Sequence, residues 1–428
     1  MLYERWCQIA ADHSAELALR DVASGRRWTF AELKAAAESS PAEAGRIIQP
    51  QGNGPEFVLA VLAAWRSGKV VCPLEPEQVA PKFLEPPANC IHLKTTSATT
   101  GAARSVAFQA CQLAADAGNI VATMGLRPDW PNLGVISMAH SYGFSNLVLP
   151  LLLHGIPLIL VPSPLPETIR LAAQGEASIT LAGVPALWRA WHEAGAIPPN
   201  MRLAISAGAP LPLALEREIF AKHELKIHNF YGSTECGGIA YDASNAPRGD
   251  DACVGAPMKN VNLSLDENGC LMVQSRAVGE TYWPEPADTL GAGRFQTSDL
   301  AEIKAGLVYL RGRASEQINV AGRKVSPLII EQALIQHPAV RGCVVFGVSD
   351  RDAGRAETIV ACVVTPRPVT SEALRQFLGE RIPAWQVPRE WWFVDSLGAN
   401  RLGKISRAKW RRRYLEESQN KRRVISDR

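Results

Sequence analysis

Between residues 133 and 206 the chain alternates between short apolar runs and segments whose apolar residues recur on a helical period. Short apolar runs bounded by Gly, Pro or polar residues are typical of buried strands, whereas spacings of three and four residues are typical of amphipathic helices. This alternation predicts an α/β fold whose loops after the strands are available for ligands. The predicted strands cover residues 133–138, 157–161, 179–182 and 203–206, and the helices between them cover residues 146–153, 169–174 and 185–193.

The same two patterns occur in the first hundred residues. Thr29 and Glu32 are spaced as a capping box, which predicts that a helix begins there. A helix is also predicted over residues 57–65, and buried strands over residues 70–74 and 90–93. The α/β pattern therefore begins near the N-terminus.

After residue 251 the pattern changes to short strands and tight turns. Two strands, 261–265 and 270–274, flank the turn sequence Asp-Glu-Asn-Gly, which predicts a hairpin. Past Arg313, helices predicted over residues 327–336 and 371–381 alternate with strands predicted over residues 340–348, 358–364 and 390–394. We therefore expect a large, multi-layer α/β N-terminal domain with a β-rich end over residues 1–312. A small α+β C-terminal domain should follow over residues 313–428.

Length and composition indicate that the chain forms two domains and that its charge is unevenly distributed. The 428 residues exceed the size at which single hydrophobic cores stop growing. The net charge of +3 gives no reason to expect nucleic acid as a partner. Residues 401–428 hold eleven Lys or Arg against three Asp or Glu, with the most basic stretch from about residue 411. We interpret this tail as a solvated helix, with an anionic partner or a membrane surface as the alternative.

Cysteine usage and the N-terminus both favour a cytoplasmic location. Nine scattered cysteines include no C-x-x-C pair, which favours free thiols in a reducing compartment over disulfides or a zinc site. The first five residues lack the layout of a signal peptide. Prolines interrupt the most apolar segment, residues 146–164, so we expect a buried helix and strand there and no transmembrane segment.

A cluster of hydroxyl side chains follows the predicted strand at residues 90–93. It reads Thr-Thr-Ser-Ala-Thr-Thr-Gly-Ala-Ala-Arg over residues 95–104. Hydroxyls, free backbone N–H groups and a guanidinium suit phosphate oxygens, although such clusters are more often polar surface loops. The Walker A pattern is absent. The candidate phosphate-binding residues are Thr96, Ser97, Thr99, Thr100, Gly101 and Arg104.

Further candidate residues lie later in the chain. Tyr231 offers an aromatic face for a purine, and the hydroxyl of Thr234 and carboxylate of Glu235 suit Mg²⁺ beside phosphates. Asp299 follows a predicted strand and has the side chain needed to accept from both ribose hydroxyls. Lys404 sits in a Gly-containing loop. Taken singly, each is equally well a turn residue, a helix cap or a solvated lysine.

The order of these motifs carries more information than any one of them. They follow the order of the core motifs of the adenylate-forming superfamily, which includes acyl-CoA synthetases, peptide-synthetase adenylation domains and luciferases. Residues 96–106 are similar to its phosphate loop Thr-Ser-Gly-Thr-Thr-Gly-x-Pro-Lys-Gly-Val, and residues 229–235 to Asn-x-Tyr-Gly-x-Thr-Glu. Residues 297–299 resemble its Thr-Gly-Asp motif, and Lys404 falls on its catalytic lysine. The chain resembles this family over nearly its whole length.

The resemblance implies an activity, its co-substrates and a set of roles. A carboxylic acid, aryl or fatty, would react with ATP to give an acyl-adenylate and pyrophosphate, and a thiol of CoA or of a carrier-protein phosphopantetheine would then displace AMP. Lys404, Glu235 and His140 would be catalytic, and Mg²⁺ would be held by Thr99 and Glu235. Beyond the phosphate loop, the nucleotide would contact Gly208, Ala209, Pro210, Asn229, Tyr231, Gly232, Thr234, Asp299 and Arg313.

The resemblance also implies where the acid and the thiol bind. The acid would contact His140, Tyr142, Phe144, Ser206, Cys236 and Gly237, with a packed helix start as the alternative for Tyr142 and Phe144. No Asp aligns with the residue that pairs an amino acid's ammonium group, which favours aryl or fatty acids. For the second step the small domain would rotate about residues near Ser315. The loop Gly322, Arg323 and Lys324 would then line a pantetheine tunnel.

The phosphate loop departs from the family pattern. Ala98, Ala103, Arg104 and Ser105 stand where Gly, Pro, Lys and Gly are usual. Arg for Lys keeps the charge but changes its geometry. Two alternatives to a thiol ligase stay open, and the altered loop favours only the second of them. One is the same adenylation chemistry with a non-thiol acceptor, as in lactone or amide formation, and the other is a nucleotide-binding homologue with weak or no catalysis.

Overall fold

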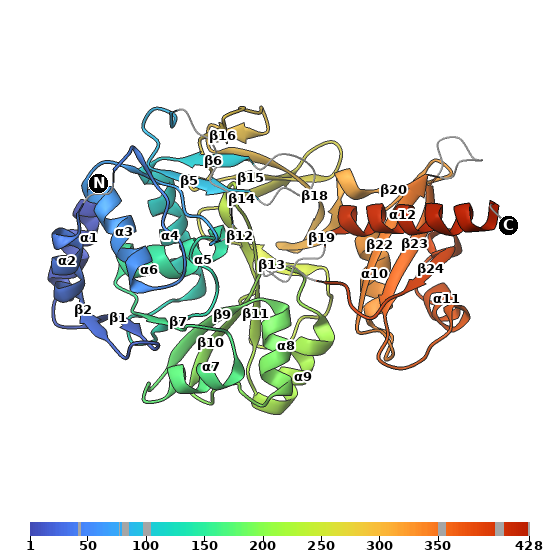
Figure 1. Cartoon of the computed structure of the whole chain (residues 1–428), viewed down its shortest axis with the longest axis horizontal. Coiled ribbons are helices and arrows are strands. Elements are labelled where there is room, and N and C mark those ends of the chain that lie inside the picture. The colour runs from blue at the N-terminus through green and yellow to red at the C-terminus, as the bar shows by residue number, and fades with distance from the viewer. Residues whose placement is uncertain are drawn as a thin grey trace.

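The computed structural model describes residues 1–41, 44–76, 78, 85–96, 104–349, 357–398 and 406–426, with side chains up to 418. The largest hydrophobic cluster draws on residues from Leu2 to Val308, and two smaller clusters draw on residues from Ile318 to Trp410. Figure 1 shows the second group of elements, coloured orange to red, at the C-terminal end of the molecule. The predicted boundary between residues 312 and 313 lies between these groups and stays a prediction.

Half of the largest sheet is parallel and positions the candidate site. Its parallel strands lie in the order β11, β10, β9, β7, β8 and β1, and β2 pairs antiparallel at the edge. This confirms the predicted α/β class. The bounds are β1 Leu17–Asp21, β2 Arg27–Thr29, β7 Asn132–Gly134, β8 Leu158–Leu160, β9 Ile179–Gly183, β10 Met201–Ser206 and β11 Ile227–Ser233.

The other half of that sheet is antiparallel and continues from β11. The order is β12, β13, β19, β18, β15 and β14, with β17 also paired to β18. The predicted hairpin is confirmed as β14 and β15, in which Leu265 pairs with Leu271. The bounds are β12 Gly237–Tyr241, β13 Cys253–Pro257, β14 Asn262–Leu265, β15 Cys270–Gln274, β17 Leu290–Gly291, β18 Arg294–Lys304 and β19 Leu307–Arg313.

A second sheet has five strands in the order β16, β6, β5, β4 and β3 (Figure 1). Strands β5 and β6 form an antiparallel hairpin in which Thr95 pairs with Ser105, so the candidate phosphate loop joins two neighbouring strands. The bounds are β3 Ile47–Ile48, β4 Val70–Val71, β5 His92–Thr95, β6 Ser105–Phe108 and β16 Thr281–Trp283.

Helices cover the sheets and fill the space between them. The side chains of Thr29 and Glu32 form the predicted capping box at the start of α2. Helix α4 was not predicted, yet it packs against both α6 and β12. The bounds are α1 Leu2–Asp12, α2 Phe30–Ser39, α3 Pro55–Arg66, α4 Ala110–Met124, α5 Ser141–Gly143, α6 Leu149–His154, α7 Pro166–Ala173, α8 Pro185–Glu193 and α9 Leu213–His223.

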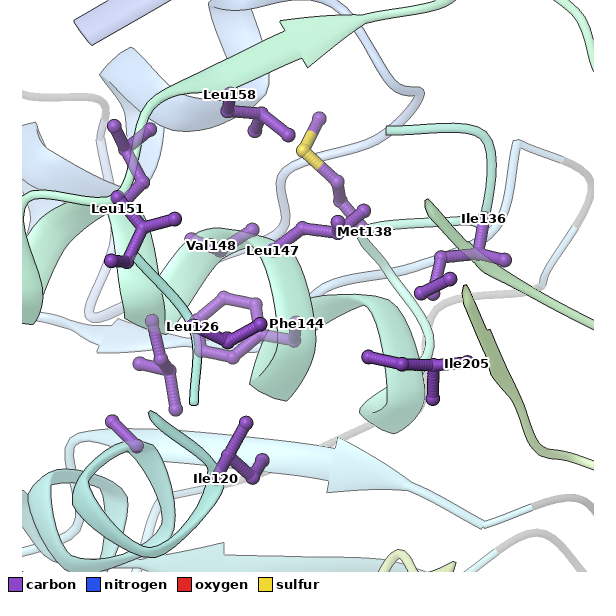
Figure 2. Packing of buried hydrophobic residues seen from close by; sticks show 14 of the residues in the cluster. Ile120, Leu126, Ile136, Met138, Phe144, Leu147, Val148, Leu151, Leu158 and Ile205 are labelled. Atoms are coloured by element: carbon purple, nitrogen blue, oxygen red, sulfur yellow. The ribbon is translucent and has the colours of Figure 1, made fainter. Parts of the chain in front are cut away.

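The core beside the site is built around a turn of π-helix, η1 (Phe144–Val148), between α5 and α6. Figure 2 shows Phe144 among aliphatic side chains that include Leu126 and Leu147. The ring of Phe144 is 1% exposed and lies 4.3 Å, centroid to centroid, from the ring of His92. Because η1 continues directly from α5, the packing of this core fixes the position of the loop that precedes α5.

The C-terminal elements form a small α+β unit, as predicted. Helix α10 packs on β22, and β22, β23 and β24 form a three-stranded sheet beside the two-stranded hairpin of β20 and β21. In the described parts of the chain, no helix is both long and apolar enough to cross a bilayer. The bounds are η2 Ala314–Glu316, β20 Ile318–Val320, β21 Arg323–Val325, α10 Pro327–Ile335, β22 Gly342–Ser349, β23 Glu357–Val364, α11 Ser371–Gly379, η3 Ala384–Gln386, β24 Glu390–Phe393 and α12 Arg407–Ser426.

Candidate functional site

Several of the candidate residues lie where the parallel strands of the large sheet end. His140 and Tyr142 follow β7, Ser206 is the last residue of β10, and Tyr231 lies near the end of β11. The phenol of Tyr142 donates a hydrogen bond of 3.4 Å to the carbonyl oxygen of Gly183, the last residue of β9. Since β7 has β8 on one side and β9 on the other, the strand order reverses here. Open α/β sheets bind ligands at such switch points.

A chain of hydrogen bonds joins three of the predicted nucleotide-binding residues. The phenol of Tyr231 donates to the carboxylate of Asp299 at 2.5 Å. Nε of Arg313 donates to the other oxygen of that carboxylate at 3.0 Å, and Asp299 and Arg313 are paired residues of β18 and β19. Burial, and after it the negative charge of Asp299, holds the pKa of Tyr231 well above its usual range. An aromatic ring, a carboxylate and a cation are thus fixed together.

A second chain joins Glu235 to the phosphate-loop hairpin through Tyr282 of β16. The phenol of Tyr282 donates to the carboxylate of Glu235 at 3.1 Å. The guanidinium carbon of Arg104 lies 5.7 Å from the centre of the Tyr282 ring. The backbone N–H of Glu235 donates to Ser233 Oγ at 3.2 Å and so holds the turn that precedes Glu235. Sequence reasoning missed Tyr282, because a single Tyr beside Trp-Pro carries no recognisable motif.

Only the two ends of the predicted phosphate loop are described. Both the backbone N–H and the hydroxyl of Thr96 donate to the carbonyl oxygen of Arg104, at 2.8 and 3.0 Å. This pair closes the hairpin at the base of the loop. The remaining predicted phosphate-binding residues, Ser97, Thr99, Thr100 and Gly101, lie outside the described residues, as does Lys404. Their roles stay predictions.

Three predicted nucleotide-binding residues, Gly208, Ala209 and Pro210, follow β10 and are at least partly exposed. Gly208 and Pro210 are exposed, and Gly208 has a positive φ of +84°, which suits glycine in this turn. The hydroxyl of Ser206 is buried without a hydrogen-bond partner among the described residues. Asn229 is buried, and its side-chain amide donates to the carbonyl oxygen of Cys253 at 3.2 Å, so in this structure it braces β11. Gly232 and Thr234, two further predicted nucleotide-binding residues near the end of β11, are also at least partly accessible to solvent, as is Ala209 after β10.

His140 and Tyr142, both predicted to contact the acid, lie in the segment that follows β7. His140 caps α5, and its Nδ1 accepts from the backbone N–H of Tyr142 at 3.4 Å. The ring of Tyr142 lies 5.8 Å from that of Phe230. Phe144, in contrast, points into the hydrophobic core shown in Figure 2. This agrees with the alternative prediction, in which Phe144 belongs to a packed helix start.

The turn Cys236–Gly238 closes against a buried ion pair that sequence reasoning missed. Asp116 of α4 accepts from the backbone N–H of Gly238 at 3.2 Å and from Ser145 Oγ at 2.6 Å. Lys94 Nζ lies 3.6 Å from Asp116 and donates to Ser145 at 3.0 Å, and both charged side chains are at most 3% exposed. Burial lowers the pKa of Lys94, which Asp116 partly offsets.

That close approach explains the small residues of this turn. Gly237 has a φ of +68°, and a methyl group there would overlap the carboxylate of Asp116. Cys236 is fully buried, with its sulfur 3.3 Å from Ser233 Oγ, and burial raises the pKa of its thiol. A signal for the ion pair was present in the sequence: Lys94 and Asp116 are lone charges in apolar segments.

The predicted thiol loop forms the turn of the β20–β21 hairpin. Val320 pairs with Arg323, so the turn has two residues, Ala321 and Gly322, both with positive φ. Gly322 N–H donates to the side-chain oxygen of Asn319 at 2.9 Å. Arg323 and Lys324 are exposed on the second strand.

The side chains near Glu235 suit Mg²⁺, which is commonly held partly by substrate and water, better than a metal ion that protein side chains alone coordinate. Among the residues that the structure describes, no three His, Cys, Asp or Glu side chains come together. Mg²⁺ is commonly bound by one or two carboxylates together with substrate phosphates and water. The carboxylate of Glu235, held by Tyr282, supplies one such ligand, and the second predicted ligand, Thr99, is not described.

The chain is similar in sequence to proteins of known families. Residues 79–287 match the family model described as AMP-binding enzyme, and residues 329–404 match the AMP-binding enzyme C-terminal domain. The chain is 28% identical over 347 residues to the protein named "Probable 2-succinylbenzoate--CoA ligase" of Mycobacterium tuberculosis, covering 76% of this chain and 84% of that protein. It is 29% identical over 240 residues to "Fatty acid--[acyl-carrier-protein] ligase ScoC" of Streptomyces coeruleorubidus, covering 52% and 46%.

Solved structures share the fold over nearly the full chain. ATP-bound MatB from Rhodopseudomonas palustris superposes with a TM-score of 0.84 at 21% identity, covering 97% of this chain and 99% of that one. MenE from Bacillus subtilis, in complex with the acyl-adenylate intermediate OSB-AMP, gives a TM-score of 0.80 at 20% identity, covering 95% and 97%. At these identities the likeness establishes the fold alone.

Proposed function

The chain belongs to the family of AMP-binding enzymes, and on this premise we propose that it is an acid–thiol ligase. It activates a carboxylic acid with ATP as an acyl-adenylate and then transfers the acyl group to a thiol. The observation that carries the proposal is the chain of hydrogen bonds that joins Tyr231, Asp299 and Arg313. Tyr231 lies near the end of β11, which ends two residues before Glu235. In this proposal Tyr231 is the adenine surface, Asp299 is the ribose acceptor, and Glu235 is the carboxylate on the phosphate side.

In the first step an oxygen of the carboxylate attacks the α-phosphorus of ATP. The bond from that phosphorus to the bridging oxygen breaks, and pyrophosphate leaves. Tyr231 stacks on the adenine, and the Asp299 carboxylate accepts from the ribose hydroxyls, with Arg313 holding that carboxylate in place. Arg104, at the base of the phosphate loop, neutralises phosphate charge, and Lys404 bridges the acid and the α-phosphate.

Glu235 and Thr99 are the residues that would hold Mg²⁺. When bound, Mg²⁺ neutralises charge on the phosphate oxygens. Tyr282 donates a hydrogen bond to the Glu235 carboxylate and would restrain it as a ligand. His140, the cap of α5, would contact the carboxylate of the acid.

In the second step a thiol sulfur attacks the acyl carbon, AMP leaves with the bonding electron pair, and the thiol proton is released. We propose that the small domain rotates about Ser315 between the steps, which withdraws Lys404 and brings the Gly322–Lys324 turn to the thiol. The nine cysteines are all free thiols, in keeping with a reducing compartment such as the cytoplasm.

An aryl or fatty acid suits this site better than an amino acid. Asp116, the carboxylate behind the Cys236–Gly238 turn, is already paired with Lys94 and so does not offer a partner for an ammonium group. The named relatives act on 2-succinylbenzoate and on a fatty acid, by their names, which supports the same class here.

Pyrophosphate exchange over a panel of aryl and fatty acids, with and without CoA, tests the proposal. We expect acid-dependent exchange, and a thioester once CoA or a phosphopantetheinyl carrier protein is added. Exchange without any thioester would move the function to a non-thiol acceptor. ATP binding without exchange for any acid would leave a nucleotide-binding protein without ligase activity.

A further inference from the structure

The large sheet carries a buried cluster of four charged side chains that the proposed chemistry does not use. Each of the four is at most 8% exposed, and they are Glu216, Lys226, Asp242 and Arg248. They come from α9, from the residue before β11, and from the segment that joins β12 to β13. Desolvation largely offsets the attraction within buried ion pairs, so a gain in stability alone does not account for such a cluster.

Glu216 lies at the centre of the cluster. Its Oε2 accepts from Nε of Arg248 at 2.8 Å, and its Oε1 accepts from the backbone N–H of Arg248 at 3.1 Å. Nζ of Lys226 donates to the same Oε1, and also to Asp242 at 2.5 Å. Two cations thus face two carboxylates, and the four charges balance. The cluster is therefore suited to holding the backbone around it and not to binding an ionic ligand.

The guanidinium of Arg248 extends from this cluster to two segments of the proposed nucleotide site. Nη2 donates at 2.7 Å to the carbonyl oxygen of Leu211, which directly follows the predicted nucleotide-binding residues 208–210. Nη1 donates at 2.7 Å to the carbonyl oxygen of Cys253. That oxygen also accepts from the side-chain amide of Asn229, another predicted nucleotide-binding residue. One side chain thereby restrains both the loop after β10 and the side chain of Asn229.

The register of the sheet places these two segments side by side. Ser206 and Asn229 are paired residues of the parallel strands β10 and β11. The loop after Ser206 therefore runs beside the residues that follow Asn229, which include Tyr231. An error in the position of the loop would change the space next to the Tyr231 ring.

A second side chain of the β12–β13 segment holds the same loop. The carboxylate of Asp251 accepts at 2.6 Å from the backbone N–H of Leu213, the first residue of α9. The carbonyl oxygen of Asp251 in turn accepts from Nη1 of Arg248 at 3.3 Å. The end of the loop is thus held by two side chains that also contact each other.

We propose that Arg248 is a positioning residue for recognition of the adenine base. The inference rests on the proposed function, in which residues 208–210 and Tyr231 bind ATP. The side chain of Arg248 is 2% exposed, so it acts through the backbone of Leu211 and Cys253. Its planar fork donates in fixed directions to Glu216 and to both carbonyl oxygens, which sets the loop against the end of β11.

Replacing the fork by a single ammonium group tests this role. Arg248→Lys keeps the charge that faces Glu216 but cannot reach both carbonyl oxygens at once. We expect the KM for ATP to rise about tenfold, while kcat and the KM for the acid change by less than about twofold. The preference for ATP over GTP should also fall, because the loop contacts the base and not the triphosphate. Pyrophosphate exchange at varied nucleotide and varied acid measures these quantities.

Arg20→Lys is the matched control. Arg20 also pairs with a carboxylate, that of Glu176 at 2.8 Å, and also donates to a backbone carbonyl oxygen, that of Ala172. It belongs to β1, at the opposite end of the parallel strands from β11. This variant loses the same kinds of contact, and its KM for ATP should equal that of wild type.

A second variant decides the question if Arg248→Lys does not fold. Asp251 is only partly buried, so Asp251→Ala removes the other contact to the loop at a smaller cost in stability. We expect its KM for ATP to rise about threefold with the KM for the acid unchanged. A folded Arg248→Lys with the wild-type KM for ATP would overturn the proposal. Equal rises in the KM for ATP and for the acid, or an unchanged preference for ATP over GTP, would do so as well.

A catalysis-independent readout keeps this inference separate from the ligase proposal. If the wild-type chain shows no pyrophosphate exchange, the proposed function fails, and calorimetric titration with ATP decides the role of Arg248. ATP binding about tenfold weaker in Arg248→Lys than in Arg20→Lys would still support it. Equal binding to the two variants, or a wild-type chain that binds no ATP, would overturn it.

Discussion

Tyr231 and Asp299 lie 68 residues apart in the chain, yet the phenol of one donates a 2.5 Å hydrogen bond to the carboxylate of the other. Tyr231 comes from β11 in the sheet's parallel half and Asp299 from β18 in its antiparallel half. The strand order β11, β12, β13, β19 and β18 separates them. The nucleotide site that we propose would thus lie across the junction of the two halves.

Removing the charge of Asp299 should weaken ATP binding selectively. Asp299→Asn keeps an acceptor for Tyr231 but loses the charge that pairs with Arg313, and we expect the KM for ATP to rise between about 10- and 100-fold. Tyr231→Phe keeps the ring and should cost only a few fold. Steady-state exchange at varied ATP measures both. Ser298→Ala, at the exposed neighbour, is the control, and an unchanged KM in Asp299→Asn would remove this carboxylate from the nucleotide site.

Glu235 should set the Mg²⁺ requirement of the first step. Glu235→Gln removes the charged ligand, so we expect exchange to fall about 100-fold and to recover in part as Mg²⁺ is raised. Tyr282→Phe loses only the orienting hydrogen bond and should shift the Mg²⁺ dependence by a few fold. Exchange rates measured across a Mg²⁺ series test this. Exposed Glu285→Gln is the control, and a Glu235→Gln variant with a wild-type Mg²⁺ profile would contradict the assignment.

Lys404 should be needed for chemistry and dispensable for ATP binding. Lys404→Ala removes the cation that brings two anions together, and we expect acid-dependent exchange to fall by about 100-fold or more while the Kd for ATP changes little. Isothermal titration gives the second quantity. Lys409→Ala, an exposed lysine of α12, should behave as wild type in both assays. Unchanged exchange in Lys404→Ala would remove this residue from the mechanism.

The Lys94–Asp116 pair should stabilise the protein only as a pair. Either Asp116→Ala or Lys94→Ala leaves one uncompensated charge in the core, and we expect a loss of about 3 to 4 kcal/mol in the free energy of unfolding. The double substitution Lys94→Ala with Asp116→Ala should lose less than the two single losses combined. Urea unfolding in a double-mutant cycle gives the coupling energy. Strict additivity would show that the two charges do not interact.

Acid should destabilise the fold through His154. Burial, with a smaller contribution from Arg5, lowers the pKa of His154 to about 4 from an ordinary value near 6.5. The unfolded chain therefore binds a proton more readily, and the stability present above pH 6.5 is lost as the pH falls toward 4. Between pH 7 and pH 5 we expect wild type to lose about 1 kcal/mol more than His154→Gln, after allowance for partial exposure. Urea midpoints at both pH values measure this, and equal losses would contradict it.

Local patterns predicted the elements whose identity depends on neighbouring residues. The capping box of Thr29 and Glu32 and the hairpin of β14 and β15 formed as expected, because a few adjacent residues decide a cap or a tight turn. Helix α4 was missed because Gln112, Asp116 and Asn119 interrupt its apolar face, yet all three are buried. Each has a partner from a distant segment: Gln112 bonds Glu280, for example, 168 residues away. No local pattern reveals such a partner.

The sequence by itself determined the α/β class, the order of the motifs and most of the residues gathered at the ends of β7, β10 and β11. The tertiary structure alone decided that Tyr282 holds Glu235, that Asp116 supports the Cys236–Gly238 turn, and that the ring of Phe144 belongs to the core. The physical reason is that strand order and register are set by hydrogen bonds between segments far apart in the chain. Which side chains then meet depends on that register, and the residue spacing of a motif does not encode it.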